Sequence, residues 1–258
     1  MSVRVLLLAA LVLVLAADSA SASVVWAVGD GGNGSAEAKR VARTIAADHP
    51  KRVLYLGDVY EHGTAADFRD RFETVYGALR SRMEPTPGNH DWPNHRTGYD
   101  PYWLKPHHYS LTVGGWKIIS INSETPNDAA QLRYLRRRLA GHRCSLVFMH
   151  RPRFTAGAHH SEERVVDRIW RTLRGRARLL LGGHDHNLQR FKRVHGTTQL
   201  VIGAGGRERY TVNRADHRLA FSNDTADGAL RMQLRPGVAR LRIVRADGRV
   251  LDRSTARC

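Results

Sequence analysis

The sequence predicts an α/β fold in which two mixed β-sheets form a sandwich flanked by helices. Near the N-terminus an apolar run, a helical pattern and a second apolar run occupy 24–28, 35–48 and 52–56, an order typical of a βαβ unit with parallel strands. Gly114-Gly115 lies between two strand patterns and indicates an antiparallel hairpin, so we expect the first sheet to be mixed. From Leu188 onward, alternating strand patterns predict a second, antiparallel sheet packed on the first.

The individual elements follow from residue patterns. Ser35 fits the N-cap of the first helix, which carries an apolar stripe at helical spacing. The segment 92–105 is expected to be an ordered loop whose aromatic residues pack on the core rather than wall a cleft. The remaining predictions are a helix over 65–80, strands over 83–85, 109–113 and 116–121, a helix from 127 closed by Gly141, a strand over 146–149, a helix over 165–173, and strands over 178–181, 190–194, 198–202, 229–234, 238–244 and from 250.

The first 22 residues are predicted to be a secretory signal peptide. Arg4 provides a basic start, Val5 to Ala17 form an apolar run, and Ala20-Ser21-Ala22 fits the small-x-small rule for cleavage after Ala22. The alternative is an uncleaved membrane anchor, although the run is shorter than the about 20 apolar residues of a bilayer span. We therefore expect an exported, secreted protein with one domain over 23–258 and no membrane span in the mature chain.

The chain is strongly basic, with 41 Lys and Arg against 24 Asp and Glu and a net charge of +17. The arginines are spread over the whole length, which is typical of a solvated surface but also permits attraction of anionic substrates, nucleic acid or cell-envelope polymers. An exported chain permits a disulfide, and Cys144 and Cys258 are its two cysteines. The sequence leaves open whether they pair.

Side chains with metal-ligand atoms stand at five points, and four of these directly follow an apolar run. They are Gly29-Asp30, Gly57-Asp58, Asn89-His90-Asp91 after Pro87-Gly88, His150, and His184 with His186 after Gly182-Gly183. Parallel strands bring their carboxyl ends to one edge, and a carboxylate buried there needs a partner. Each Gly-Asp alone could be a simple turn, and His150 a hydrogen-bonded core histidine, but the five together predict a two-metal hydrolytic site.

Roles within this site follow from chemistry. Asp58, at the end of the second strand of the βαβ unit, is the candidate to bridge two metals. Asn89 can bind through its amide oxygen, which leaves His90 free to face substrate as a general acid. His184 and His186 flank one residue, so an extended backbone would point both the same way.

The ordered set Gly-Asp, Gly-Asp, Gly-Asn-His-Asp, His and Gly-His-x-His resembles the calcineurin-like metallophosphoesterase superfamily, from Val24 to about Gly206. The resemblance implies a two-sheet sandwich with a dinuclear metal centre at the strand ends. Carried over position by position, it implies a first metal held by Asp30 and His186, a second held by Asn89, His150 and His184, Asp58 as the bridge, and His90 as general acid.

One departure from the common pattern concerns the first motif. Glycine (Gly32) stands where most of the superfamily has histidine, as in the purple acid phosphatase branch, which supplies a tyrosine after the bridging aspartate instead. Here Tyr60 lies two residues beyond Asp58, and Glu61 takes the third place usual for that tyrosine. We expect Tyr60 to bind the first metal, with Glu61 or water as alternatives. A phenolate suits iron(III) at the first site, with iron, zinc or manganese at the second. Without Tyr60, manganese, zinc or ferrous iron become equally good candidates.

The resemblance implies a metal-dependent phosphoric ester hydrolase that is acid phosphatase-like. Its substrate would be a phosphorylated small molecule, a monoester attacked by metal-activated hydroxide with His90 protonating the leaving group. His159, His160 and Arg151 are weaker candidates for phosphate contacts. A phosphodiesterase or nuclease on the same metals is the rival enzyme, and a polyanion-binding secreted protein with an inactive metal site is the rival outside enzymes. No protein partner is implied.

Overall fold

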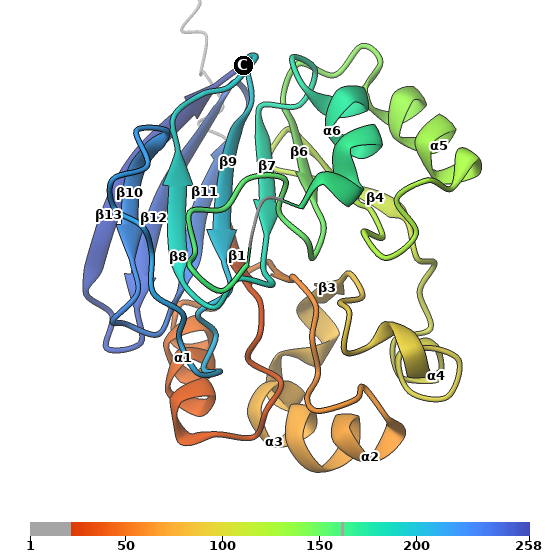
Figure 1. Ribbon diagram of the computed structural model, residues 1–258, viewed down its shortest axis with the longest axis vertical. Coiled ribbons are helices and arrows are strands. Elements are labelled where there is room, and N and C mark those ends of the chain that lie inside the picture. The colour runs from red at the N-terminus through yellow and green to blue at the C-terminus, as the bar shows by residue number, and fades with distance from the viewer. Residues whose placement is uncertain (1–21, 161–162) are drawn as a thin grey trace, which may run out of the picture.

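Two mixed β-sheets face each other across a central apolar layer in the computed structural model, which describes residues 22–160 and 163–258 (Figure 1). The first sheet has the strand order β13-β12-β11-β1-β2-β3, and the second has the order β10-β8-β9-β7-β6-β5-β4. The strands are β1 (Ser23–Val28), β2 (Arg52–Tyr55), β3 (Met83–Pro85), β4 (Tyr109–Val113), β5 (Trp116–Ser120), β6 (Ser145–Phe148), β7 (Leu179–Gly182), β8 (Leu188–Phe191), β9 (Thr198–Ile202), β10 (Leu219–Asn223), β11 (Gly228–Arg235), β12 (Val238–Arg245) and β13 (Val250–Arg257). The predicted fold class is therefore confirmed. The predicted signal peptide lies outside the described residues, apart from Ala22.

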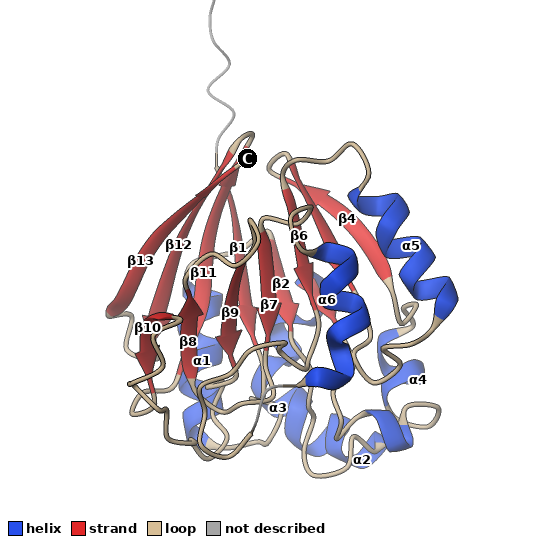
Figure 2. Ribbon diagram, turned by 45° about the horizontal axis from the view of Figure 1, so that its top comes forward, coloured by secondary structure: helices blue, strands red, loops and turns tan. Residues whose placement is uncertain are grey.

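Helices flank the sandwich on its outer faces (Figure 2). The helices are α1 (Ala36–Ala47), α2 (Ala65–Asp67), α3 (Glu73–Tyr76), α4 (Tyr99–Trp103), α5 (Ala129–Leu139) and α6 (Asp167–Leu173). In α5 and α6, Leu132, Leu135 and Ile169 pack on Val147 and Leu180 of the second sheet. No helix of the described residues is long and apolar enough to cross a membrane.

The assignment of strands to sheets was predicted wrongly. The strands from Leu188 onward do not form a sheet of their own. Strand β9 pairs in parallel with β7, and β8 and β10 continue the second sheet, whereas β11 pairs antiparallel with β1 and extends the first. Alternation of polar and apolar residues shows which face of a strand is buried, and it carries no information about the neighbouring strand.

The segment between β2 and β4 also differs from its prediction. The helix expected over 65–80 is divided, because a π-helical turn, Phe68–Phe72, separates α2 from α3, and a 3₁₀ segment, Gly77–Arg82, follows. The expected loop over 92–105 contains a 3₁₀ turn, Trp92–Asn94, and α4. Tyr99 and Trp103 of α4 are buried in the same cluster as Phe68, so the expected core packing is confirmed for both.

The candidate ligand loops and the disulfide lie at opposite edges of the sandwich. The parallel strands β1, β2, β6 and β7 all end at the lower edge in Figure 1, where the loops carrying the candidate ligands begin. The C-terminus lies at the upper edge, where Cys258 forms a disulfide with Cys144, with 5.1 Å between their Cα atoms. The two cysteines therefore pair, 114 residues apart in the chain.

Candidate metal centre

The five predicted clusters meet at the carboxyl ends of the parallel strands. Asp30 follows β1, Asp58 follows β2, and His184 follows β7 by two residues. All three have left-handed backbone conformations, with φ of 60°, 67° and 68°. Such conformations are uncommon for residues other than glycine and gather at functional sites. The turn after each strand thus directs a polar side chain back across the sheet edge.

One group of ligand atoms surrounds the Nε2 atom of His150. This atom lies 2.9 Å from Asn89 Oδ1, 3.1 Å from His184 Nδ1 and 3.4 Å from Asp58 Oδ2. Asp58, His150 and His184 are all buried, and their ligand atoms lie within 4.8 Å of one another. The backbone N–H of His90 donates to the other Asp58 oxygen, Oδ1, at 3.0 Å, so Oδ2 is the oxygen turned to this group.

A second group adjoins the first and includes Tyr60. The Tyr60 hydroxyl lies 3.0 Å from Asp30 Oδ1 and 2.9 Å from His186 Nε2. Asp30 Oδ2 accepts the backbone N–H of His184 at 2.9 Å, which leaves Oδ1 for this group. Glu61, the alternative to Tyr60, instead accepts two hydrogen bonds from Arg207 at 2.8 and 3.1 Å.

Each of the three candidate ligand histidines has a hydrogen-bond partner on the nitrogen that faces away from the group. His150 Nδ1–H donates to the Leu56 carbonyl at 2.8 Å, and His186 Nδ1–H donates to the Glu208 carbonyl at 2.8 Å. His184 reaches Glu163 Oε1 through Nε2 at 3.2 Å. These acceptors fix the tautomers that leave a lone pair on His150 Nε2, His186 Nε2 and His184 Nδ1 for a metal.

The electrostatics of the two groups favour a bound cation. Burial lowers the pKa of His184 to about 3 and that of His186 to about 4, so both rings are neutral at pH 7. Burial, and then repulsion from Asp58, raise the pKa of Asp30 well above its ordinary value. Two adjacent buried carboxylates repel each other and are costly without a positive partner, and the neutral imidazoles present lone pairs that can bind one. The donor set therefore fits metal ions, with hard oxygen ligands in the Asp30 group.

Asp91 has a structural role that was not predicted from the sequence. Its Oδ2 accepts the backbone N–H groups of Asp58 and Gly88, both at 2.8 Å, and its Oδ1 accepts that of Val59 at 2.9 Å. The carboxylate thus joins the loop after β2 to the loop after β3. At Gly88 a Cβ atom would collide with Asp58 Oδ1, so only glycine permits this approach.

His90 lies beside the two groups with its ring fixed. Its Nδ1–H donates to the Glu61 carbonyl at 2.6 Å, and its Nε2 lies 4.0 Å from Asp58 Oδ2. The side chain is 35% exposed, so solvent reaches it. A proton on Nε2 is therefore placed beside the candidate ligands and can be replaced from water.

The weaker candidates for phosphate contact lie at the rim. Arg151 Nη1 is 3.2 Å from His184 Nε2, and its guanidinium is paired with Glu124 at 2.9 Å and Glu163 at 3.4 Å. Of the two neighbours of His184 Nε2, Glu163 is the one that can accept its proton. His160, Glu163 and His184 also form a set whose ligand atoms lie within 4.8 Å of one another.

Tyr210 was missed by the sequence analysis. Its ring stacks on His186 at 4.2 Å between centroids and on His159 at 4.1 Å. Arg207 was also missed, and it lies over the Tyr60 ring at 4.6 Å. Both residues stand in an irregular segment more than twenty residues beyond His184, where no motif marks them.

His184 and His186 reach the site in a different way from the one predicted. An extended backbone would have placed both rings on one side, but the positive φ of His184 breaks the extended geometry. As a result His184 joins the Asn89 group and His186 joins the Asp30 group. The turn needs Gly183 before it, where a Cβ atom would come within 2.6 Å of Asp30 Oδ2.

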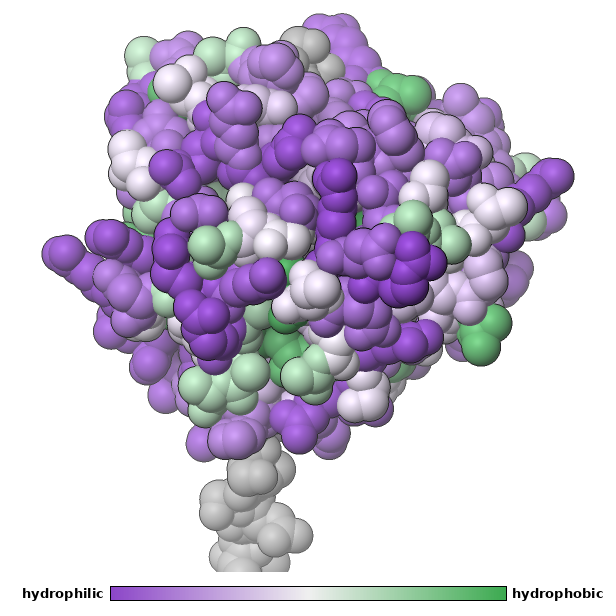
Figure 3. Space-filling model, turned by 90° about the horizontal axis from the view of Figure 1, so that it is seen from below, coloured by the Kyte–Doolittle hydropathy of each residue, from purple (hydrophilic) through white to green (hydrophobic). Residues whose placement is uncertain are grey.

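From below, the face at this edge is mainly hydrophilic (Figure 3).

This fold and this arrangement of ligands define a class of phosphoesterases with metal centres. The family model of the calcineurin-like phosphoesterases matches residues 23–188, and the chain belongs to that family. The family and fold imply two metal ions. No protein of the curated set matches the chain in sequence.

Three solved structures illustrate the likeness. Purple acid phosphatase PPD1 from yellow lupin (Lupinus luteus) is 16% identical with a TM-score of 0.80, over 91% of this chain and 53% of that one. GAP50, the anchor in the inner membrane complex of Plasmodium, is 14% identical with a TM-score of 0.78, over 92% and 89%. A dimetal phosphatase from Danio rerio is 11% identical with a TM-score of 0.63, over 92% and 99%. At these identities the likeness shows a shared fold.

Proposed function

We propose that this protein is a secreted phosphoesterase with a dinuclear metal centre that hydrolyses phosphate monoesters. The observation that carries the proposal is the fixed tautomer of each candidate ligand histidine. His150, His184 and His186 all present a lone pair to the same region as Asp30, Asp58 and Asn89. Three histidines held in this way support bound metal, and His90, whose ring is fixed beside them, supports a catalytic use of that metal.

The proposed first site comprises Asp30, Tyr60 and His186, the second comprises Asn89, His150 and His184, and Asp58 bridges them. The Tyr60 hydroxyl contacts both other members of the first site, which supports it over Glu61 as the ligand. A phenolate, carboxylates and a single imidazole are suited to iron(III) at this site, with iron, zinc or manganese at the second.

The chain's own residues support the reaction in defined ways. Metal ions held there would supply Lewis acidity to the phosphoryl group and lower the pKa of an attacking water. His90 donates a proton from Nε2 to the leaving oxygen, because its Nδ1 is committed to the Glu61 carbonyl. Asp91 holds the loops of Asp58 and His90 in register. Arg207, over the Tyr60 ring, and Arg151, beside His184, are the cations placed to contact phosphate oxygens.

Export is part of the proposal. The N-terminal sequence pattern supports a signal peptide, and the Cys144–Cys258 disulfide supports it independently. Disulfides form and persist in oxidising compartments and are rare in the cytosol. The predicted product is the chain from residue 23 onward, folded as one domain.

Comparison of an aryl phosphomonoester with the matching diester, across pH on the metal-reconstituted protein, tests the function. Faster monoester hydrolysis, lost in His90→Ala, is the expected result. Faster diester hydrolysis would replace the proposal by the phosphodiesterase or nuclease alternative. Absence of turnover with both esters and every metal, together with salt-dependent binding to DNA or polyphosphate, would favour a polyanion-binding protein instead.

A further inference from the structure

The outer face of the first sheet carries arginines that the metal centre does not use. In β11 the side chains of Leu230, Met232 and Leu234 enter the central core, so their neighbours point to the opposite face. The side chains on that face from β11, β12 and β13 form what we call the arginine face: Arg231, Arg235, Arg240, Arg242, Arg253 and Arg257. In Figure 2 no helix covers the upper parts of these three strands.

Three of these arginines form a row across the three strands. Arg231 pairs across the ladder with Arg242, and Arg242 pairs with Arg253. Neighbouring strands lie about 4.8 Å apart, and like charges directly opposite destabilise a sheet. Arg231 is neutralised by Asp48 at 2.7 and 3.0 Å. Within residues 22–160 and 163–258, the other five members of the arginine face form no ion pair.

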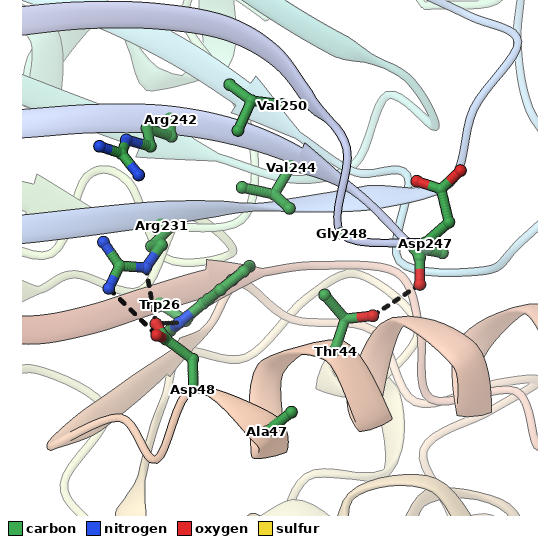
Figure 4. A pocket seen from close by; sticks show the side chains of 11 residues that line it. Trp26, Thr44, Ala47, Asp48, Arg231, Arg242, Val244, Asp247, Gly248 and Val250 are labelled. Carbon is green, nitrogen blue, oxygen red and sulfur yellow. Dashed lines mark hydrogen bonds and ion pairs between the residues drawn. The ribbon is translucent and has the colours of Figure 1, made fainter.

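The arginine face is hollowed rather than filled by other side chains. A hollow of about 580 Å³ lies between the end of α1 and strands β11 and β12 (Figure 4). In that view Arg231 is turned to Asp48, whereas Arg242 has no bonded partner among the residues drawn. A second hollow of about 250 Å³ lies between β12 and β13 and is lined by Arg240, Arg242 and Arg253. The larger hollow also holds the carboxylates of Asp48 and Asp247, whereas no acidic side chain of the described residues lines the smaller one. Anionic groups can therefore approach the guanidinium groups most readily between β12 and β13.

We propose that the arginine face binds the anionic headgroups of a lipid membrane. The arginines spread over three neighbouring strands, so they form a two-dimensional array that suits a surface of headgroups better than a single polymer chain. A platform for single-stranded nucleic acid uses exposed aromatic rings, but Trp26, the aromatic residue that lines the larger hollow, is 2% exposed. The attraction would be electrostatic and would not require apolar insertion.

The start of the described chain supports a membrane as the occupant. Ala22 lines a hollow together with Arg235 and Arg240 of the arginine face. In the sequence the apolar run ends at Ala17, and an extended chain of five residues spans at most about 18 Å. Until this run is removed, the arginine face therefore lies close to any membrane that the run enters. After its removal the same arginines can retain the protein at an anionic leaflet.

Vesicle binding of the proposed mature chain, 23–258, which contains every described helix and strand, tests the proposal. Vesicles of phosphatidylcholine with about one third phosphatidylglycerol are compared with pure phosphatidylcholine by co-sedimentation at low and physiological salt. We expect binding to the anionic vesicles alone, weakened by salt. The triple variant Arg240→Gln, Arg242→Gln, Arg253→Gln should bind roughly a hundredfold more weakly, since each arginine near an anionic surface contributes roughly fivefold.

A matched control separates position from net charge. Arg133→Gln, Arg136→Gln and Arg137→Gln remove the same charge from the exposed side of α5 and should weaken binding by less than about threefold. Equal losses in both triple variants, or no binding by the parent chain, would overturn the proposal. So would displacement of the vesicles by duplex DNA that binds through the same three arginines. Thermal unfolding checks that the variants are folded. We expect the midpoint temperature of the Arg240, Arg242, Arg253 variant to be no lower than that of the parent, because the substitutions relieve like-charge repulsion.

Discussion

Replacement of Asp91 by asparagine should strongly destabilise the metal-free protein, although Asp91 is not a candidate metal ligand. Asp91 is 1% exposed and accepts three backbone N–H groups. An asparagine oxygen placed at Oδ2 keeps the bonds from Asp58 and Gly88, but its amino group then faces the N–H of Val59. Two buried donors are left without acceptors, at about 1–3 kcal/mol each, so the expected loss is about 2–6 kcal/mol.

Burial raises the pKa of Asp91 to about 8, so urea denaturation of the metal-free protein at pH 9 measures this loss with the carboxylate ionised and without a contribution from metal binding. Asp70→Asn is the matched control, because Asp70 is 58% exposed and pairs with Arg69 on the surface. Its free energy of unfolding should change by no more than about 0.5 kcal/mol. A loss below about 1 kcal/mol in Asp91→Asn would refute the argument that this carboxylate joins the two ligand loops.

Three further predictions concern single groups. Burial raises the pKa of Tyr60 well above 10, so its hydroxyl is protonated in the metal-free protein. Binding of metal by the phenolate would release that proton, so calorimetry of metal binding at pH 7, in buffers of different ionisation enthalpy, should show one fewer proton released by Tyr60→Phe than by the parent. Equal proton release would contradict a Tyr60 ligand. Cys258→Ser opens a loop of 114 residues and should lower the free energy of unfolding by about 2–5 kcal/mol relative to the oxidised parent. The reduced parent is the control and should match the variant, and a further difference between those two would contradict this. Burial raises the pKa of Asp48, but hydrogen bonds from Arg231 and Trp26 outweigh burial and lower the pKa overall. The ionised Asp48 therefore stabilises the folded protein by about 1 kcal/mol above pH 4, and this contribution is lost as the pH falls through the folded pKa. The stability of Asp48→Asn should approach that of the parent in acid, and a constant difference down to pH 2 would contradict this.

The positions of the candidate ligands were predictable because each stands at the end of an apolar strand. Asp30, Asp58 and His150 directly follow buried runs, and parallel strands bring their ends to one edge whatever the details of the loops. The same reasoning yields α1 with its Ser35 cap, whose side chain accepts the N–H of Ala38 at 3.1 Å. Strand ends and helix caps depend on residues that are neighbours in the chain, so they can be predicted from the sequence.

Features that depend on long-range contacts were not predictable. The sheet that β11 joins is decided by its pairing with β1, about two hundred residues earlier in the chain. Tyr210 stacks on His186 because an irregular segment returns to the site, and Glu163 reaches His184 from the loop before α6. The positive φ of His184 is a tertiary constraint on a residue whose spacing from His186 indicated extended backbone.

The proposed function depends on a pair of metal ions that Asp58 would bridge, with His90 beside them as the acid. Metal analysis of the purified parent, Asp58→Asn and His90→Ala tests this most directly. We expect two equivalents in the parent, at least one fewer in Asp58→Asn, and two in His90→Ala, with activity lost in both variants. Two full equivalents in Asp58→Asn would contradict the bridge, and loss of metal from His90→Ala would contradict the role of His90 as an acid that binds no metal.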